Sequence, residues 1–78
     1  MATSINSNYY LFYFCSLDGV SDKLQRHMYK ENHTVYAKEY KEKENTYELG
    51  LLEINSKQGE FIDWYEVPKN SIHHFEIK

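Results

Sequence analysis

A run of aromatic residues near the start of the chain restricts the fold more than any other feature. The segment Tyr9 to Ser16 reads YYLFYFCS and is bounded by polar and turn-forming residues. It is too short for a convincing helix, and its composition is typical of a β-strand. Since side chains alternate along a strand, Phe12 faces one side and Leu11 the other. Both faces are therefore apolar, and such strands are normally covered on both sides.

A short helix is predicted directly after this strand, from Ser21 to Lys30. Ser21 can cap the first turn with its hydroxyl group. Val20, Leu24 and Met28 recur at four-residue spacing and would form the apolar stripe that packs on the sheet.

The segment Thr34 to Lys43 has two interpretations. The sequence AKEYKEKE has high helix propensity, whereas Thr34-Val35-Tyr36 and the spacing of Tyr36 and Tyr40 suit a strand. Downstream, Thr46 to Leu51 alternates in polarity, so a hairpin that turns between residues 43 and 45 would pair the two segments. We favour the hairpin.

The last third of the chain shows two more strands. Residues 55–59 form a turn between Leu51 to Ile54 and a strand at Glu60 to Val67. Pro68 ends that strand, and Ile72 to Ile77 is predicted as the last one. The expected fold class is α+β: an antiparallel sheet of about five strands in the order β-α-β-β-β-β, with one short helix packed on one face.

Length and composition indicate one small domain spanning residues 1–78, whose residues 1–8 are a polar N-terminal segment. The single cysteine, Cys15, allows no internal disulfide, and its apolar surroundings predict a buried thiol. No Lys or Arg occurs in the first 22 residues, which argues against a secretory signal. The apolar run is also too short to span a membrane as a helix. We therefore expect a cytoplasmic protein with no membrane partner.

The charge pattern argues against nucleic-acid binding. The net charge is -3, and Lys and Glu alternate between residues 38 and 44 instead of forming a basic patch. Binding to phosphates requires clustered Lys and Arg. Aromatic residues, by contrast, make up 17% of the chain and include eight tyrosines, a residue suited to surfaces that are partly apolar and partly hydrated.

No catalytic, metal or cofactor motif stands out, so we expect no enzyme activity, no metal and no cofactor. His73 and His74 are adjacent on a predicted strand, which would direct their side chains to opposite faces and prevent them from sharing an ion. His27 and His33 lack a carboxylate at ligand spacing. Gly19 and Gly50, like Gly59, are isolated glycines that suit turns or bulges and form no phosphate loop.

Coverage of the sheet leads to a functional hypothesis. One helix of about ten residues, roughly 15 Å long, cannot cover both faces of a five-stranded sheet, so one face should stay open. Exposed aromatic patches mark interaction sites, although tyrosines can also simply pair across a hydrated sheet face. We expect a partner-binding surface that comprises Tyr9, Tyr13, Tyr36, Tyr40, Tyr47, Trp64 and Tyr65.

These features suggest a small non-enzymatic interaction protein that occupies the surface of a protein partner, as inhibitors, immunity proteins and phage-encoded counter-defence proteins do. A homodimer that pairs through the open face or the edge at Ile72 to Ile77 is also expected. One alternative is a domain that binds or sequesters a small nucleotide-like ligand. A second alternative is a hydrolase-type enzyme that uses His73 or His74 with Asp63.

Overall fold

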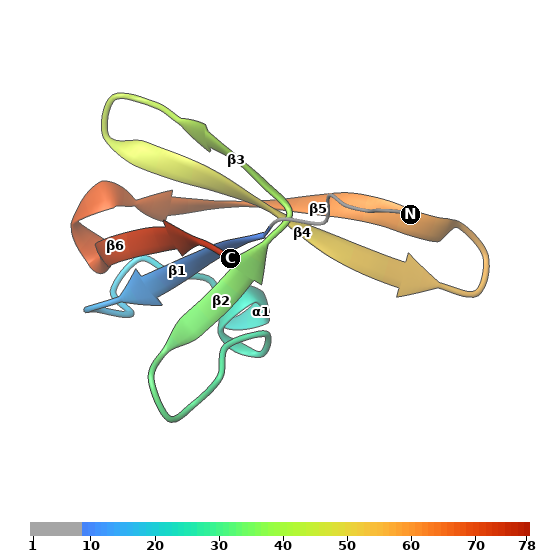
Figure 1. Ribbon diagram of the computed structural model, residues 1–78, viewed down its shortest axis with the longest axis horizontal. Helices are drawn as coiled ribbons and strands as arrows, with labels where there is room; N and C mark the ends of the chain where they lie inside the picture. Colours follow the sequence, from blue (N-terminus) through green and yellow to red (C-terminus); the bar gives the residue numbers. More distant parts are fainter. Residues whose placement is uncertain (1–8) are drawn as a thin grey trace.

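The structure is a computed structural model that describes residues 9–78, so the expected N-terminal segment, residues 1–8, lies outside the described part of the chain. Its elements, drawn in Figure 1, are β1 (Tyr10–Phe14), α1 (Asp22–Gln25), β2 (Thr34–Ala37), β3 (Glu39–Glu42), β4 (Thr46–Asn55), β5 (Gly59–Pro68), the 3-10 helix η1 (Lys69–Ser71) and β6 (Ile72–Ile77). The segment Thr34 to Lys43 contains two strands and no helix, and β3 forms the predicted hairpin with β4, whereas β2 pairs with β1.

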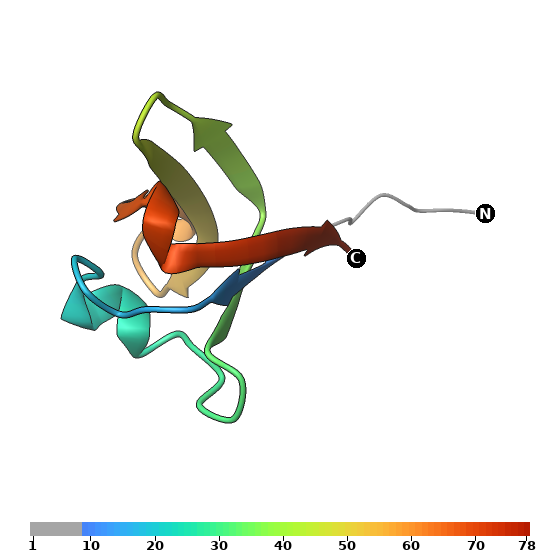
Figure 2. The ribbon, with the colours of Figure 1, turned by 90° about the vertical axis from the view of Figure 1, so that its left-hand side faces the viewer.

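The strands form two antiparallel three-stranded sheets, in the orders β2-β1-β6 and β3-β4-β5. The prediction of one five-stranded sheet is therefore wrong, and α+β holds only in outline, because the described chain is mainly β with little helix. Viewed from the end, the two sheets enclose a common interior (Figure 2). Each sheet thus covers one face of the other, a role that the prediction had given to the helix.

A β-bulge at Lys38 explains why the predicted second strand divides into β2 and β3. Glu39 is paired with Gly50 of β4, and the N–H of Lys38 also donates to the Gly50 carbonyl oxygen at 2.7 Å. Lys38 and Glu39 therefore both lie opposite Gly50, and a strand bends and twists at such a bulge. Before the bend β2 pairs with β1, and after it β3 pairs with β4.

The interior is built from the alternating positions that the sequence pattern predicts. Phe12 from β1, Val35 from β2, and Leu49 and Val67 from β4 and β5 are at most 1% exposed and belong to one cluster. Burial of such side chains contributes about 1.5–3 kcal/mol each to the free energy of folding. Contact between the two sheets is therefore the main source of stability.

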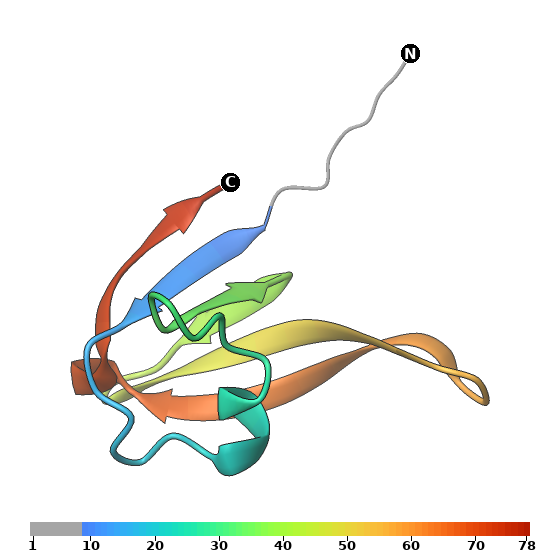
Figure 3. The ribbon, with the colours of Figure 1, turned by 90° about the horizontal axis from the view of Figure 1, so that it is seen from below.

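The helix is much shorter than predicted. Ser21 caps it as expected, since its Oγ accepts a hydrogen bond from the Leu24 N–H at 3.1 Å. The chain then has to turn back, because Tyr29 pairs with Thr34 in an isolated antiparallel bridge. Residues 29–34 cannot be helical in this arrangement, although Leu24 and Met28 are buried as predicted. In Figure 3, α1 lies beside the β4–β5 hairpin.

Cys15 is exposed, so the prediction of a buried thiol is wrong. Phe12 and Phe14 face the core, so alternation directs Cys15, the residue after the end of β1, to the outer face that Tyr13 shares. The thiol lies on the surface, where its Sγ is 3.4 Å from the carbonyl oxygen of Asn70.

Two leucines on opposite faces of β4 provide a test of this packing. Leu49 is fully buried, whereas Leu52 is 38% exposed. Leu49→Ala should reduce the free energy of unfolding by about 2–5 kcal/mol, because it leaves a cavity between the sheets. Leu52→Ala, the matched control, should cost about 1 kcal/mol or less. Urea denaturation of both variants measures the difference, and similar losses would contradict the assigned faces of β4.

Candidate functional site

The seven aromatic residues predicted to form one surface are divided by the fold between the interior and two outer faces. Tyr40, Tyr47 and Tyr65 contribute to the interior. Tyr40 lies 5.8 Å and Tyr47 5.9 Å from the Phe12 ring, centroid to centroid, and Tyr65 is only 8% exposed. Tyr40 and Tyr47 are partly buried against the core and Tyr65 belongs to it, so these three rings are not part of the exposed aromatic surface that the sequence predicted.

Trp64 lies on the outer face of the β3-β4-β5 sheet, away from the other aromatic residues. Its ring packs on Gly50, where an added Cβ would come within 3.1 Å of the indole ring and 2.8 Å of Ile62 Cγ2. The Nζ of Lys41 is 4.5 Å from the Trp64 ring centroid, and the ring remains 36% exposed. Gly50 is thus required by its close packing against Ile62 and Trp64.

Tyr9, Tyr13 and Tyr36 share the outer face of the β2-β1-β6 sheet. The Tyr9 and Tyr36 rings meet edge to face with their centroids 6.2 Å apart. Tyr29, which the sequence analysis left out, extends this row, because its ring lies 5.9 Å from that of Tyr36. Tyr29 and Tyr36 are 54% and 41% exposed.

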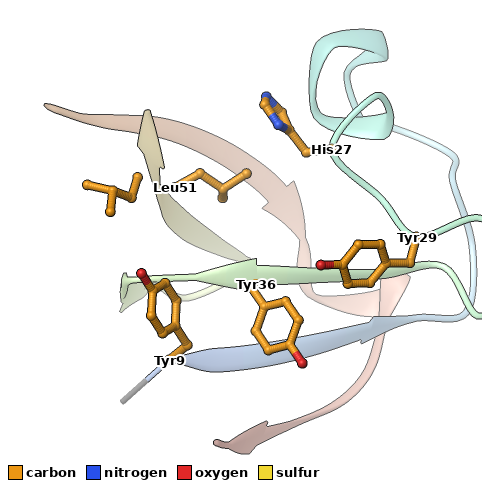
Figure 4. A pocket seen from close by; sticks show the side chains of 6 residues that line it. Tyr9, His27, Tyr29, Tyr36 and Leu51 are labelled. Atoms are coloured by element: carbon orange, nitrogen blue, oxygen red, sulfur yellow. The ribbon is translucent and has the colours of Figure 1, made fainter. Parts of the chain in front are cut away.

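Tyr9, Tyr29 and Tyr36 line a groove of about 220 Å³ where β2 and β4 diverge, and we call it the tyrosine groove. Its lining residues are Tyr9, His27, Tyr29, Tyr36, Leu51 and Leu52. In Figure 4, the hydroxyl of Tyr29 points toward the middle of the groove and that of Tyr9 toward the leucine side chains, whereas the hydroxyl of Tyr36 points away from them. His27 lies across the groove from Tyr9 and Tyr36. The groove therefore combines the side chains of two leucines with those of three tyrosines and a histidine, and polar atoms make up more of its exposed lining than apolar atoms do.

The backbone of β4 beside the groove is an open sheet edge. Lys43 N–H donates to Thr46, and Lys69 N–H donates to Asn45. In an antiparallel ladder, even-numbered residues of β4 must then face β3, and odd-numbered ones face β5. β3 pairs no further along β4 than Gly50. The N–H and C=O groups of Leu52 and Ile54 consequently point to a side where residues 9–78 provide no strand.

The opposite wall of the groove has a similar open position. Phe14 N–H donates to the His33 carbonyl oxygen, so the odd-numbered residues of β2 bond to β1. Thr34 faces the other way and pairs with Tyr29. The backbone N–H and C=O of Tyr36 also point away from β1, and within residues 9–78 no backbone group forms a hydrogen bond with them. Both walls of the groove thus present unpaired backbone groups.

Ion pairs hold α1 and the loop after it against the β4–β5 hairpin, which fixes the position of His27. Lys23 Nζ donates to Asp63 Oδ2 at 3.1 Å, and the Tyr65 hydroxyl donates to the same oxygen at 3.1 Å. His27 Nε2 lies 3.0 Å from Glu53 Oε2, although the angles are not those of a hydrogen bond. The hydrogen bond from Lys23 lowers the pKa of Asp63.

The two adjacent histidines lie on the same side of the sheet, so the prediction that they face opposite sides is wrong. Tyr13 pairs with His74 but Phe14 pairs with Ile72, which leaves His73 as the extra residue of a bulge in β6. Ile72 and Phe75 both pack on the core, and the two residues between them project outward. The Nδ1 atoms of His73 and His74 are 2.6 Å apart.

Within residues 9–78 no group of three or more His, Cys, Asp or Glu side chains is placed to hold a metal ion. That part of the chain also has no helix with the length and hydropathy needed to cross a membrane. Comparison with protein-family models, with curated proteins and with solved structures gives no match. The site must therefore be interpreted from its own geometry.

The interaction with Asp63 predicts how stability depends on pH. Because the pKa of Asp63 is lower in the folded chain than in the unfolded chain, its stabilising effect is complete above the unfolded value of about 3.9. The effect is lost as the pH falls through the folded value. Asp63→Asn should therefore be less stable than wild type at neutral pH, and the two should converge in strong acid. Urea denaturation across the acidic range measures this.

Asp18→Asn provides a control for the pH experiment, because Asp18 is exposed and makes no ion pair with residues 9–78. This variant should follow the wild-type profile throughout. A difference between wild type and Asp63→Asn that does not change with pH would contradict the assigned role of the carboxylate.

Proposed function

We propose that this chain is a non-enzymatic interaction domain that binds an extended segment of a protein partner as an additional strand along the open edge of β4. The observation that carries the proposal is the edge itself. Among residues 9–78, no strand pairs with the outward-facing backbone groups of Leu52 and Ile54, which lie beside a groove with three partly exposed tyrosines, Tyr9, Tyr29 and Tyr36. Strand addition uses backbone hydrogen bonds for affinity and side-chain pockets for specificity.

The side chains around the edge suit an apolar segment. Leu52 is 38% and Ile54 71% exposed, and both lie on the outer face of the hairpin with Trp64. Tyrosine and tryptophan are the residues that most often dominate binding energy. An added strand would place alternate side chains in the groove and over this apolar face.

Charge favours an acidic residue within the bound segment. Lys38 is 4.7 Å from the Tyr9 ring centroid, and among the described residues it has no carboxylate partner. A carboxylate on the partner could pair with it at the end of the groove. The sequence suggests an inhibitor or immunity-type protein. In that role, the chain would bind an extended segment of its target protein and so prevent other molecules from reaching that segment.

The volume of the groove supports a peptide more than a sequestered small molecule. Pockets for drug-sized ligands usually measure about 300–1,000 Å³ and enclose most of the ligand. At about 220 Å³ the groove is smaller, and it continues into an open strand edge. The small-ligand and hydrolase alternatives are therefore supported less well than strand addition.

Proline substitution tests the proposal, because proline removes a backbone donor from a strand edge. Leu52→Pro removes an N–H that points to the open side of β4 and leaves the β4–β5 hydrogen bonds intact. Ile62→Pro is the matched control, since Ile62 pairs with Leu52 and its N–H points to the outer edge of β5. Circular dichroism should show both variants folded.

Peptides selected from a displayed random library against the wild-type chain provide the ligand. We expect the affinity of these peptides to fall at least tenfold for Leu52→Pro and to remain nearly unchanged for Ile62→Pro. In the complex with the wild-type chain, the Leu52 amide should become protected from hydrogen exchange. Equal losses in the two variants would contradict the proposal. So would sedimentation showing a dimer of the free chain in which the Leu52 amide is already protected from exchange.

A further inference from the structure

We propose that His73 and His74 form a binding site for a divalent transition metal ion, with Zn²⁺ or Cu²⁺ held between their Nδ1 atoms. The two atoms face each other at 2.6 Å on the outer side of the β6 bulge. Imidazole nitrogen is a preferred ligand for both ions. This site is separate from the tyrosine groove and does not depend on the proposed function.

The orientation of His74 is already that of a metal ligand. Its Nε2 lies 3.2 Å from Glu76 Oε2, so the carboxylate accepts the Nε2–H and leaves the Nδ1 lone pair directed at His73. A histidine that ligates a metal usually donates its other N–H to a carboxylate in this way. Glu76 is held in turn by Lys78, whose Nζ is 3.1 Å from Glu76 Oε1.

The ring of His74 is also fixed by stacking. The Tyr13 ring lies almost parallel to it, with centroids 4.3 Å apart and an interplanar angle of 11°. A ligand that is held before the ion binds loses little side-chain entropy on binding. Tyr13, predicted to bind a partner, is thus placed to orient this histidine.

The separation of the nitrogens is close to what a chelate needs. With metal–nitrogen bonds of about 2.0–2.1 Å and ordinary coordination angles, two ligand nitrogens lie about 2.9–3.3 Å apart. The rings therefore need to separate by only a few tenths of an ångström. Without a metal, the Nδ1–H of His73 donates a hydrogen bond to the Nδ1 of His74. Metal binding takes the place of this hydrogen bond, and His73 then carries its proton on Nε2. Water would complete the coordination of the ion.

Titration with Zn²⁺, followed by calorimetry and by nitrogen NMR of the imidazoles, tests the proposal. The measurements use a Cys15→Ser background so that the exposed thiol cannot act as a ligand. We expect one ion per chain, with the large nitrogen shift at Nδ1 of His73 and His74. His74→Ala should weaken binding at least tenfold, and Cu²⁺ should bind more tightly than Zn²⁺.

Two further variants distinguish the site from adventitious binding. Glu76→Gln should weaken binding by about 10- to 100-fold and shift the His74 tautomer, because Glu76 orients the ring without touching the ion. His33→Asn is the control and should bind normally, since asparagine tolerates the left-handed backbone at that position, where φ is 50°. Equal affinity in wild type and His74→Ala, or coordination through Nε2, would overturn the proposal.

Discussion

The bulge formed by Lys38 and Glu39 against Gly50 determines the architecture of this chain. It bends one long strand so that its first half pairs with β1 and its second half with β4. The two sheets can then face each other and bury their apolar positions without a large helix. The same bend separates β2 from β4 beyond Gly50 and opens the tyrosine groove. Stability and the candidate binding edge therefore have one physical origin.

The open edge is a feature that proteins usually avoid, because unpaired strand groups can pair with other chains. Here the β4–β5 hairpin continues past the end of β3, and in residues 9–78 no third strand pairs with its distal half. An isolated two-stranded ribbon of this kind has only marginal stability in water. The contacts of Lys23 with Asp63 and of His27 with Glu53 hold it against the body from one side. On the other side, no strand from the described residues pairs with Leu52 and Ile54.

Local sequence patterns predicted most of the strands but not the way in which they are combined. The Ser21 cap and the strand at Ile72–Ile77 depend on neighbouring residues, so they could be recognised from the sequence. The bulge at Lys38 leaves no local signal, because the alternation of Tyr36 and Tyr40 continues through it. It turns Tyr36 outward and Tyr40 inward, and strict alternation had placed both on one face.

The candidate sites also depend on contacts between distant parts of the chain, which local sequence patterns do not indicate. The bulge in β6 brings His73 and His74 together, and it depends on pairing with β1, which is distant in the sequence. Tyr29 joins the groove because it pairs with Thr34 at a turn, a contact that no periodicity indicates. The prediction that Cys15 is buried failed because the other sheet covers the face of β1 that carries Phe12 and Phe14, whereas Cys15 lies on the opposite face. Exposure of Tyr36 and Trp64 agrees with the expectation of exposed aromatic residues, whereas burial of Tyr65 does not.

Amide hydrogen exchange along β4 tests the account most directly. Leu51 and Glu53 should exchange slowly, because their N–H groups bond to β5, and Leu52 between them should exchange rapidly. That alternation would establish an open edge produced by the bend at Lys38. Equal protection of all three amides would show that the edge is already paired, and it would contradict both the assigned topology and the proposed binding mode.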